Sequence, residues 1–388
     1  MDQNAHACPE LFVRPDGKAY FDCARRALPL RSVDLELRGA ARSWDASCEE
    51  ACELARGLFS TLIGATPDDI AVVPSTAYGI ATACKLTPLS PGRQVVLMAN
   101  EHPSNVMGWL QSCAPHGAEP LFVPKPPSGE WTSELIAALS ERVAVVCFAP
   151  THWLDGTFID SAAVAAQARR FGARVVIDGT QSIGALPFDI AAVLPDFLVA
   201  SGYKWLLGPA GLSYLYVNPQ YHSGAPFENS WGNRVPASGC AQWSGLDLIY
   251  PGAYARGARR FDAAGIAKSL LPRLAIPGLR QIHQWTPAFV QERLRRRNTT
   301  LAAALPPHLV CKPSPRHGYT HILGIDLGGN DSAPIVESLE QRGVLASSRG
   351  NKLRVSSHLW NTAEDIELLH DALRIALQPW RHLPSPGE

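Results

Sequence analysis

The chain has 388 residues, 46% of them hydrophobic, which is enough to form a large buried core in one or two domains. Its 35 lysines and arginines balance its 35 aspartates and glutamates, so no net positive field favours a nucleic acid or an anionic membrane as a partner. The N-terminus shows no signal-peptide pattern, and no apolar run reaches the roughly 18 residues that a membrane helix needs. We therefore expect a soluble, cytoplasmic protein.

The nine cysteines are scattered along the chain without a Cys-x-x-Cys pair. The closest two, Cys48 and Cys52, have no second pair and no spaced histidines that would complete a zinc site. A disulfide framework is also unusual in a chain of this length. We therefore expect reduced thiols and no metal site.

Short apolar runs alternate with helical stretches between about Asp69 and Val217. The strand candidates are apolar or β-branched along most of their length: IAVVP, VVLMAN, PLFVP, VAVVCFA, RVVID, DFLVA and LSYLYV. Continuous apolar strands suit a sheet that is covered on both faces. One of the helices between them should end at Gly172, with Arg169 and Arg170 in its last turn. The pattern predicts an α/β fold with a largely parallel sheet.

The composition changes after these strands. The segment Pro219 to Tyr254 is rich in Gly, Pro, Ser and Trp without a clear period, which predicts a long irregular segment of the kind that is often functional. Helical patterning then resumes, and we interpret its basic cluster, Arg293 to Asn298, as a charged helix face. The C-terminal part predicts a small α+β domain, whose last helix is capped by Thr362 with Asp365 in the capping-box position.

Four predicted strands end in polar residues that could form a site. The pairs are Asp178 with Gln181, Ser201 with Lys204, Glu101 with His102, and Ser75 with Thr76. Ligands of open α/β sheets bind at the carboxyl ends of the strands. Each residue alone has a simpler explanation, such as a helix cap or a lysine that extends its ammonium group to water. Together, a lysine, a carboxylate, a flat ring and a helix N-terminus for an anion are the groups that a pyridoxal phosphate (PLP) site requires.

The segments VVIDGTQSIGALPFDI and DFLVASGYKWLLGPAGLSYLYV resemble the signature of the class V aminotransferase family. These fold-type-I PLP enzymes include cysteine desulfurases, kynureninases, isopenicillin-N epimerases and C–S lyases. The resemblance covers nearly the whole chain and implies a homodimer of subunits with a mainly parallel seven-stranded sheet. It also implies three parts: an N-terminal segment (1–20), a large PLP-binding domain (21–255) and a small C-terminal α+β domain (256–388).

The resemblance implies a role for each matching residue. Lys204 matches the Schiff-base lysine, which later acts as the base for the α-proton, and Asp178 matches the partner of the pyridinium nitrogen. Gln181 matches the residue that hydrogen-bonds the ring oxygen, and His102 matches the ring that stacks on the coenzyme. Four positions match the phosphate cradle: Thr76, Ala77 through its backbone N–H, Ser201 and Tyr203.

Other positions concern the substrate and the neighbouring subunit. Arg354, in LRVSSHLWNT, matches the arginine that binds the substrate α-carboxylate. Arg25 could reach a second anionic group, although an exposed surface position is the simpler interpretation. His152 and His102 are candidates for an extra acid or base, or they pack locally. Ile266 stands where many relatives carry a threonine that reaches the neighbouring subunit's phosphate, and it cannot donate a hydrogen bond.

The reaction is less constrained than the cofactor. PTHWLDGT, QWSGLD and GARRFDAAG resemble the epimerase-like and C–S-lyase-like branch of the family. Desulfurases carry a persulfide cysteine just before the arginine motif, and VLASSRGNKLRVSS contains none. We expect an enzyme that acts at Cα or Cβ of an amino acid through an external aldimine, favouring a β-eliminating C–S lyase in a biosynthetic pathway over an epimerase or aminotransferase, and a desulfurase least. A nicotinamide-dependent oxidoreductase is disfavoured because no G-x-G-x-x-G motif follows an early strand.

Overall fold

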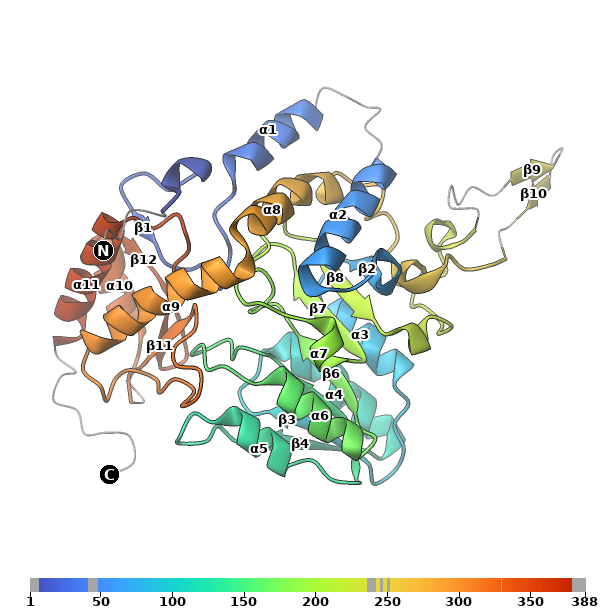
Figure 1. Ribbon diagram of the computed structural model, residues 1–388, viewed down its shortest axis with the longest axis horizontal. Helices are drawn as coiled ribbons and strands as arrows, with labels where there is room; N and C mark the ends of the chain where they lie inside the picture. Colours follow the sequence, from blue (N-terminus) through green and yellow to red (C-terminus); the bar gives the residue numbers. More distant parts are fainter. Residues whose placement is uncertain are drawn as a thin grey trace.

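The structure, a computed structural model, has two packed regions that lie side by side in Figure 1. It describes residues 7–40, 48–235, 242–244, 247–249, 252–328 and 330–378. The larger region is built around one central sheet, and the smaller region contains the last helices and short strands of the chain. Within the described ranges, no helix is both long and apolar enough to cross a membrane.

A seven-stranded sheet forms the centre of the larger region. Its strands, in spatial order, are β2 (Ile70–Val73), β8 (Ser213–Val217), β7 (Phe197–Ser201), β6 (Arg174–Asp178), β5 (Val143–Phe148), β3 (Gln94–Met98) and β4 (Glu119–Val123). Neighbouring strands are parallel, except that β8 runs antiparallel to both β2 and β7. The seven predicted strands and the predicted α/β fold class are therefore confirmed.

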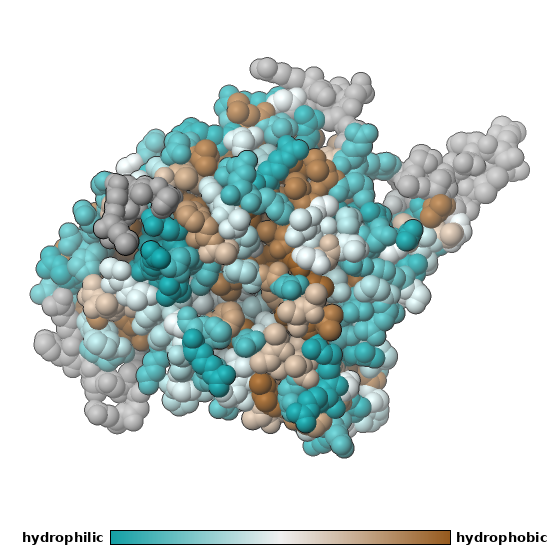
Figure 2. All heavy atoms as spheres, in the orientation of Figure 1, coloured by the Kyte–Doolittle hydropathy of each residue, from teal (hydrophilic) through white to brown (hydrophobic). Residues whose placement is uncertain are grey.

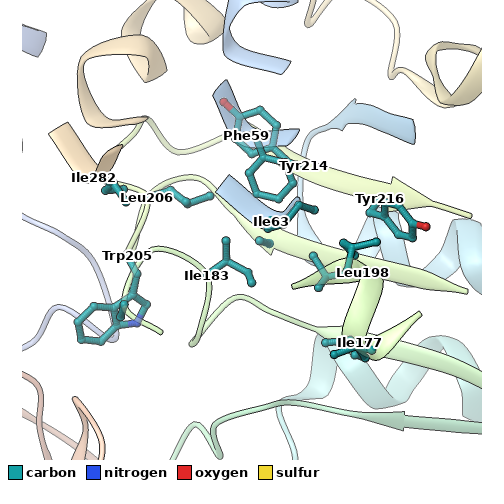
Figure 3. Packing of buried hydrophobic residues seen from close by; sticks show 14 of the residues in the cluster. Phe59, Ile63, Ile177, Ile183, Leu198, Trp205, Leu206, Tyr214, Tyr216 and Ile282 are labelled. Atoms are coloured by element: carbon teal, nitrogen blue, oxygen red, sulfur yellow. The ribbon is translucent and has the colours of Figure 1, made fainter. Parts of the chain in front are cut away.

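Helices cover both faces of this sheet. They are α1 (Arg31–Ala40), α2 (Cys48–Ile63), α3 (Thr76–Leu86), α4 (Pro103–His116), α5 (Trp131–Ala137), α6 (Ser161–Arg170), α7 (Ile190–Val193) and α8 (Leu271–Trp285). Apolar side chains of α3 and α4 pack on one face, and those of α2, α5, α6 and α8 pack on the other. Val72 and Val73 fall in different clusters because successive side chains of a strand point to opposite faces. Figure 3 shows the second face, where Phe59 and Ile63 of α2 share a cluster with Leu198 of β7.

The smaller region has its own apolar core. It contains an antiparallel sheet of β11 (Leu323–Asp326), β14 (Lys352–Val355) and β13 (Ser347–Arg349), a parallel pair of β1 (Ala19–Tyr20) and β12 (Val344–Leu345), and the helices α9 (Pro287–Ala303), α10 (Ala333–Gln341) and α11 (Ala363–Ala376). Phe21 belongs to this core although it lies near the N-terminus. The domain limits at residues 20 and 255 stay predictions.

Two predicted helix ends are confirmed. Helix α6 ends with Arg169 and Arg170 in its last turn, and Gly172 follows in the left-handed region with φ of 68°. Thr362 and Asp365 form the predicted capping box at the start of α11. These local signals were strong enough to be read without the tertiary structure.

The chain between β8 and α8 is mostly irregular, as predicted, but it also contains a hairpin of β9 (Gln242–Ser244) and β10 (Asp247–Ile249). The hairpin extends away from the large region at the right of Figure 1. The same stretch contains three short 3₁₀ helices, η3 (Pro219–Tyr221), η4 (Trp231–Asn233) and η5 (Gly257–Phe261). Two more, η1 (Pro9–Leu11) and η2 (Pro67–Asp69), lie earlier in the described chain. Residues 236–241, 245–246 and 250–251 of the predicted segment lie outside the described ranges.

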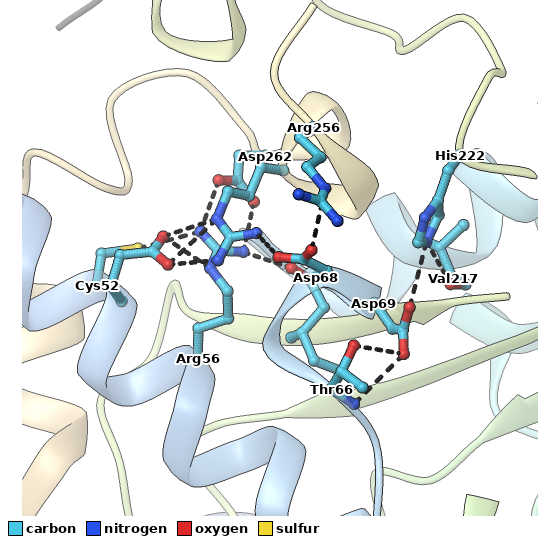
Figure 4. Close-up of polar contacts among 12 residues, drawn as sticks. Cys52, Arg56, Thr66, Asp68, Asp69, Val217, His222, Arg256 and Asp262 are labelled. Carbon is cyan, nitrogen blue, oxygen red and sulfur yellow. Dashed lines mark hydrogen bonds and ion pairs between the residues drawn. The ribbon is translucent and has the colours of Figure 1, made fainter. Parts of the chain in front are cut away.

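An ion network with the buried Arg56 at its centre joins η5 to α2 and β2 (Figure 4). Nη2 of Arg56, a residue that is 1% exposed, lies 2.8 Å from Oδ2 of Asp262, whose Oδ1 accepts a hydrogen bond from the Val72 N–H. Arg259 bridges Glu53 and Asp68, with 2.6 Å contacts to both carboxylates. The network therefore fixes the end of the irregular segment against the sheet.

Candidate active site

A pocket opens at the carboxyl ends of β2, β3, β5, β6 and β7, where ligands of α/β sheets bind. The space between its walls is about 550 Å³, which includes part of the open solvent at its mouth. Seven of the predicted site residues line it: Thr76, His102, Asp178, Gln181, Ser201, Tyr203 and Lys204. The structure thus brings together residues that are spread over about a third of the chain.

Lys204 is buried, with 7% of its surface exposed, and it lines the pocket. No carboxylate of the described residues lies within ion-pair distance of its Nζ, which is 5.7 Å from the ring of Tyr203. Burial lowers the pKa of Lys204 to about 8, opposed by the charge of Asp178 and assisted by that of Arg354. A substantial fraction of this amine is therefore neutral near pH 8, as a nucleophile or base requires.

Glycine at position 202 allows the chain to turn tightly before the lysine. A Cβ atom on Gly202 would lie 2.6 Å from the carbonyl oxygen of Leu212, so no other residue fits without a shift of the backbone. The Gly202 carbonyl accepts a hydrogen bond of 2.8 Å from the Gly208 N–H, which closes the loop. The turn therefore fixes where Lys204 enters the pocket.

Asp178 is the last residue of β6 and is 6% exposed. Its Oδ1 accepts a hydrogen bond of 3.0 Å from the backbone N–H of Thr180. The other carboxylate oxygen accepts none from the described residues, so it is available to a ligand in the pocket. A carboxylate held in this way can pair with a protonated ring nitrogen.

Three hydroxyl groups meet beside the N-terminus of α3. Oγ1 of Thr76 lies 2.8 Å from both Oγ1 of Thr180 and Oγ of Ser201. At this helix end the side chain of Ser75 accepts a hydrogen bond from the third helical N–H, that of Tyr78. The preceding N–H groups have no intrahelical acceptor, as at the start of any helix, and Ala77 carries one of them. Hydroxyls and free N–H groups at a helix N-terminus form a site that fits a phosphate group.

The amide of Gln181 is fixed from two sides. Its Oε1 accepts a 2.8 Å hydrogen bond from Nε1 of Trp205, and its Nε2 donates one of 2.9 Å to the carbonyl of Ala24. One N–H of the amide therefore remains for a ligand oxygen. Its backbone carbonyl lies 2.6 Å from Nε2 of the buried His321, which ties the site to the smaller region.

His102 is the N-cap of α4. Its Nδ1 accepts a hydrogen bond of 3.2 Å from the Ser104 N–H, so in the neutral ring the proton belongs to Nε2. Burial lowers the pKa of His102, which favours this neutral form. The edge of Trp153 packs against the ring, with 5.1 Å between the ring centroids. The imidazole is thus held in one orientation beside the pocket.

Arg354 lies near the site but does not line the pocket. It is 1% exposed, its Nη1 donates a hydrogen bond of 3.1 Å to the carbonyl of Trp153, and its Nη2 lies 3.3 Å from Oδ1 of Asp22. Burial lowers the pKa of Arg354 to about 10, so the guanidinium stays charged at neutral pH. Its predicted role in binding the substrate carboxylate stays a prediction.

Three other predicted positions also lie away from the pocket lining. His152 is 1% exposed and packs against Trp131, with 3.1 Å between its Nδ1 and Oδ1 of Asp155. Arg25 is exposed on the surface. Ile266 is buried in the apolar core of the larger region, as its lack of polar atoms favours. These three residues therefore do not line the pocket that the other seven residues form.

The chain matches the family model Aminotransferase class-V over residues 38–369. It belongs to the class V aminotransferase family. Enzymes of this family depend on PLP, so the predicted family and the predicted cofactor are confirmed. The buried Lys204, the half-partnered Asp178 and the hydroxyls beside α3 fit this cofactor by their chemistry.

Relatives of this class V aminotransferase chain differ in their reactions. An uncharacterized aminotransferase of Bacillus subtilis is 27% identical over 339 residues, which cover 84% of this chain and 83% of the relative. Isopenicillin N epimerase of Streptomyces clavuligerus is 26% identical over 82% of this chain and 83% of its own. A cysteine desulfurase of Synechococcus elongatus is 27% identical over 86% of this chain and 54% of its own. The relatives therefore do not single out one activity.

Solved structures of cysteine desulfurases and of a C–S lyase share the fold. The cysteine desulfurase CsdA of Escherichia coli has a TM-score of 0.80 at 19% identity and covers 96% of this chain and 98% of its own. A mutant of C-DES with glycine covalently linked to its PLP cofactor has a TM-score of 0.80 at 20% identity. The match covers 95% of this chain and 99% of the C-DES chain. At this identity the likeness supports the fold class rather than the reaction.

Besides the apolar Pro74 and Ala149, three residues of the pocket lining were not predicted from the sequence of this class V enzyme: Ser104, Trp153 and Thr180. Thr180 could have been identified, because it lies inside the motif Asp-Gly-x-Gln. Trp153 gave no signal of this kind, because only the tertiary structure places its loop beside His102.

Proposed function

We propose that this protein is a β-eliminating lyase of the C–S lyase type, acting on an amino acid that carries a sulfur substituent on its β-carbon. The observation that supports this most is that no cysteine lines the described pocket. Cys23 is fully buried, and burial raises its pKa well above the ordinary value. Without a protein thiol to accept it, the sulfur atom has to leave with its own substituent. This favours elimination over desulfuration.

The residues of the pocket divide into those that hold PLP and those that act on the substrate. Lys204 would hold the aldehyde carbon, Asp178 the ring nitrogen, and Gln181 the ring oxygen, while His102 would cover the ring. The phosphate would bind at the hydroxyl groups of Thr76, Thr180 and Ser201. The backbone N–H groups of Thr76 and Ala77 would also bind it. When bound, PLP supplies an electron sink that stabilises negative charge at the substrate Cα.

Lys204 is the residue that would take the α-proton. Its pKa of about 8 gives a usable fraction of neutral amine at neutral pH, and it lines the same pocket as the groups that hold the cofactor. Arg354 would orient the substrate by binding its carboxylate, because its Nε has no hydrogen-bond partner among the described residues. Burial of both side chains limits the access of water to the reacting carbon.

An epimerase is the second candidate, because isopenicillin N epimerase matches the chain over 82% of its length. Epimerisation needs a second group that returns a proton to the opposite face of Cα, and His102, which lines the pocket, is the candidate for this group in its protonated form. An aminotransferase is the remaining alternative. All three activities use the same cofactor and the same lysine.

The test incubates the purified holoenzyme with a panel of S-substituted cysteines and unsubstituted amino acids, followed by mass spectrometry of the products. We expect pyruvate, ammonia and the free thiol, and none of them from the variant Lys204→Ala. A keto acid that forms only with an added amino acceptor would indicate an aminotransferase. Inversion at Cα without a cleavage product would indicate an epimerase.

We further propose that the enzyme works as a cytoplasmic homodimer. Apolar side chains gather around α2 and α8 on the face shown in Figure 2. Leu54 of α2 and Leu270, the N-cap residue of α8, are 41% and 37% exposed. Exposed apolar patches often mark protein–protein contacts. Light scattering of the purified protein should give twice the mass of the chain, and a monomer mass would contradict the proposal.

A further inference from the structure

Glu101 is a buried carboxylic acid at the wall of the pocket. It follows β3 by three positions and is 8% exposed. Its Oε1 accepts a hydrogen bond of 2.6 Å from the backbone N–H of His102, whereas its buried Oε2 has no hydrogen-bond partner among the described residues. A buried polar atom without a partner is costly, so such an atom beside a pocket points to a ligand group.

The surroundings of Glu101 favour its protonated form more than water does. Burial is the main cause that raises its pKa to about 7, and the charges of Asp178 and Asp155 raise it further. His152 and the N–H of His102 act in the opposite direction. Near neutral pH both the protonated and the ionised form are therefore populated, as an acid that gives and regains a proton requires.

His152, whose charge lowers the pKa of Glu101, is itself held in place. Its ring packs on Trp131 with 5.5 Å between centroids, and its Nδ1 lies 3.1 Å from Oδ1 of Asp155. The other oxygen of Asp155 accepts a 2.5 Å hydrogen bond from Nζ of Lys125. This arrangement stabilises a positive charge on His152. That charge limits the rise in the pKa of Glu101 that burial causes.

We propose that Glu101 is the general acid that protonates the departing sulfur atom of the substrate. This inference rests on the proposed β-elimination. Lys204 takes the proton from Cα, the Cβ–S bond breaks, and its electron pair goes to sulfur. The proton on Oε2 of Glu101 moves to the same sulfur, which leaves as a thiol. The 2-aminoacrylate that remains is hydrolysed by water to pyruvate and ammonia, and the proton on Lys204 returns to Glu101 through solvent.

The test compares wild-type holoenzyme with Glu101→Gln on two substrates that differ in their leaving groups. Gln keeps the size and the acceptor for the His102 N–H but cannot donate a proton as an acid does. S-ethylcysteine releases a basic thiolate that needs a proton, whereas S-(para-nitrophenyl)cysteine releases a stable thiolate. We expect kcat to fall about 100-fold on the first substrate and to stay within about threefold on the second. Glu134→Gln, an exposed glutamate of α5, is the matched control and should leave both rates unchanged.

Equal losses on both substrates, or no loss on either, would overturn the role of Glu101. If the wild type cleaves neither substrate, the proposed function fails instead, and exchange of the α-proton with deuterated solvent then shows whether the earlier step survives. Cofactor absorbance of the variant confirms that it folds. If it does not fold, the wild-type pH profile decides: the rate on S-ethylcysteine should require a protonated group with a pKa of about 7, and the rate on the nitrophenyl substrate should not.

Infrared spectroscopy provides a readout that does not depend on turnover. The difference spectrum between wild type and Glu101→Gln should contain the absorption of a protonated carboxyl group, and this signal should titrate near pH 7. An ionised carboxylate throughout the range from pH 5 to pH 8, about the span over which an ordinary glutamate stays charged, would contradict the proposal.

Discussion

Arg354 and Asp22 form a buried ion pair, with Nη2 of the arginine 3.3 Å from Oδ1 of the aspartate. The two residues are 1% and 4% exposed and lie near opposite ends of the chain. The same oxygen accepts a 2.7 Å hydrogen bond from the hydroxyl of Ser347. Because the pair leaves Nε of Arg354 without a partner among the described residues, the guanidinium is oriented but not saturated. That is what the predicted role in carboxylate binding requires.

Asp22→Asn should lower the free energy of unfolding by about 3 kcal/mol, because it leaves a buried guanidinium without its counter-charge. Urea unfolding of the holoenzyme measures this change. The control is Asp34→Asn, which breaks an exposed ion pair with Arg38 on α1 and should cost no more than about 0.5 kcal/mol. Similar losses of unfolding free energy in the two variants would show that burial of the Asp22–Arg354 pair does not increase its contribution to stability.

Lys204 should react with added PLP at a rate that follows the neutral fraction of its amine. Because burial lowers its pKa to about 8, the rate for the apoenzyme should rise with pH and level off above that value, whereas an ordinary lysine would need a pH of about 10.4. Borohydride reduction and mass spectrometry measure the adduct. In Asp178→Asn the midpoint should move lower, because the carboxylate raises the pKa of the lysine. A midpoint near that of ordinary lysines would contradict the environment described above.

The strands and the lysine–aspartate pair were predictable because their signals are local. Seven apolar runs suit a sheet covered on both faces, and parallel strands place Asp178 and Lys204 at one edge of it. The contact between Asp22 and Arg354 was not predictable, because the two residues are 332 positions apart. No local pattern identifies such a pair.

The basic cluster on α9 also contains a contact that the sequence does not predict. We expected a charged helix face, and Arg295 and Arg296 do pair with Glu292 near the surface. Arg297 instead points into the smaller region, where its guanidinium donates hydrogen bonds of 2.7 and 2.8 Å to the carbonyls of His358 and Asn361. Charge alone indicates a solvated side chain, but it does not reveal which arginine meets backbone carbonyls that need a donor.

Acid should destabilise the protein through two buried histidines. Burial lowers the pKa of His321 to about 4 and that of His358 to about 3, so both are neutral in the folded state. In the unfolded chain they bind protons below their ordinary pKa of about 6.5, so stability is complete above that pH and falls as the pH drops toward the folded values. Each should cost about 2 kcal/mol at pH 5.

His358→Phe isolates half of this effect. The ring stacks on Trp360 with 4.8 Å between centroids, and its nitrogens have no hydrogen-bond partner among the described residues, so an aromatic replacement fits the contacts. The loss of unfolding free energy between pH 7 and pH 5 should shrink by about 2 kcal/mol relative to wild type. An unchanged pH dependence would mean that the histidine is protonated in the folded protein.

Thr180 should contribute to PLP binding although the sequence did not identify it. Its hydroxyl accepts a 3.2 Å hydrogen bond from the Ser201 N–H and lies 2.8 Å from the hydroxyl of Thr76, so it orients two residues of the proposed phosphate site. Thr180→Val keeps the shape but removes these bonds and should weaken PLP binding about tenfold, since one such bond is worth about 1 kcal/mol or slightly more. Thr180→Ser, which keeps the hydroxyl, should bind nearly as well as wild type. Equilibrium titration of the apoenzymes with PLP measures both, and equal affinities of the valine and serine variants would remove Thr180 from the phosphate site.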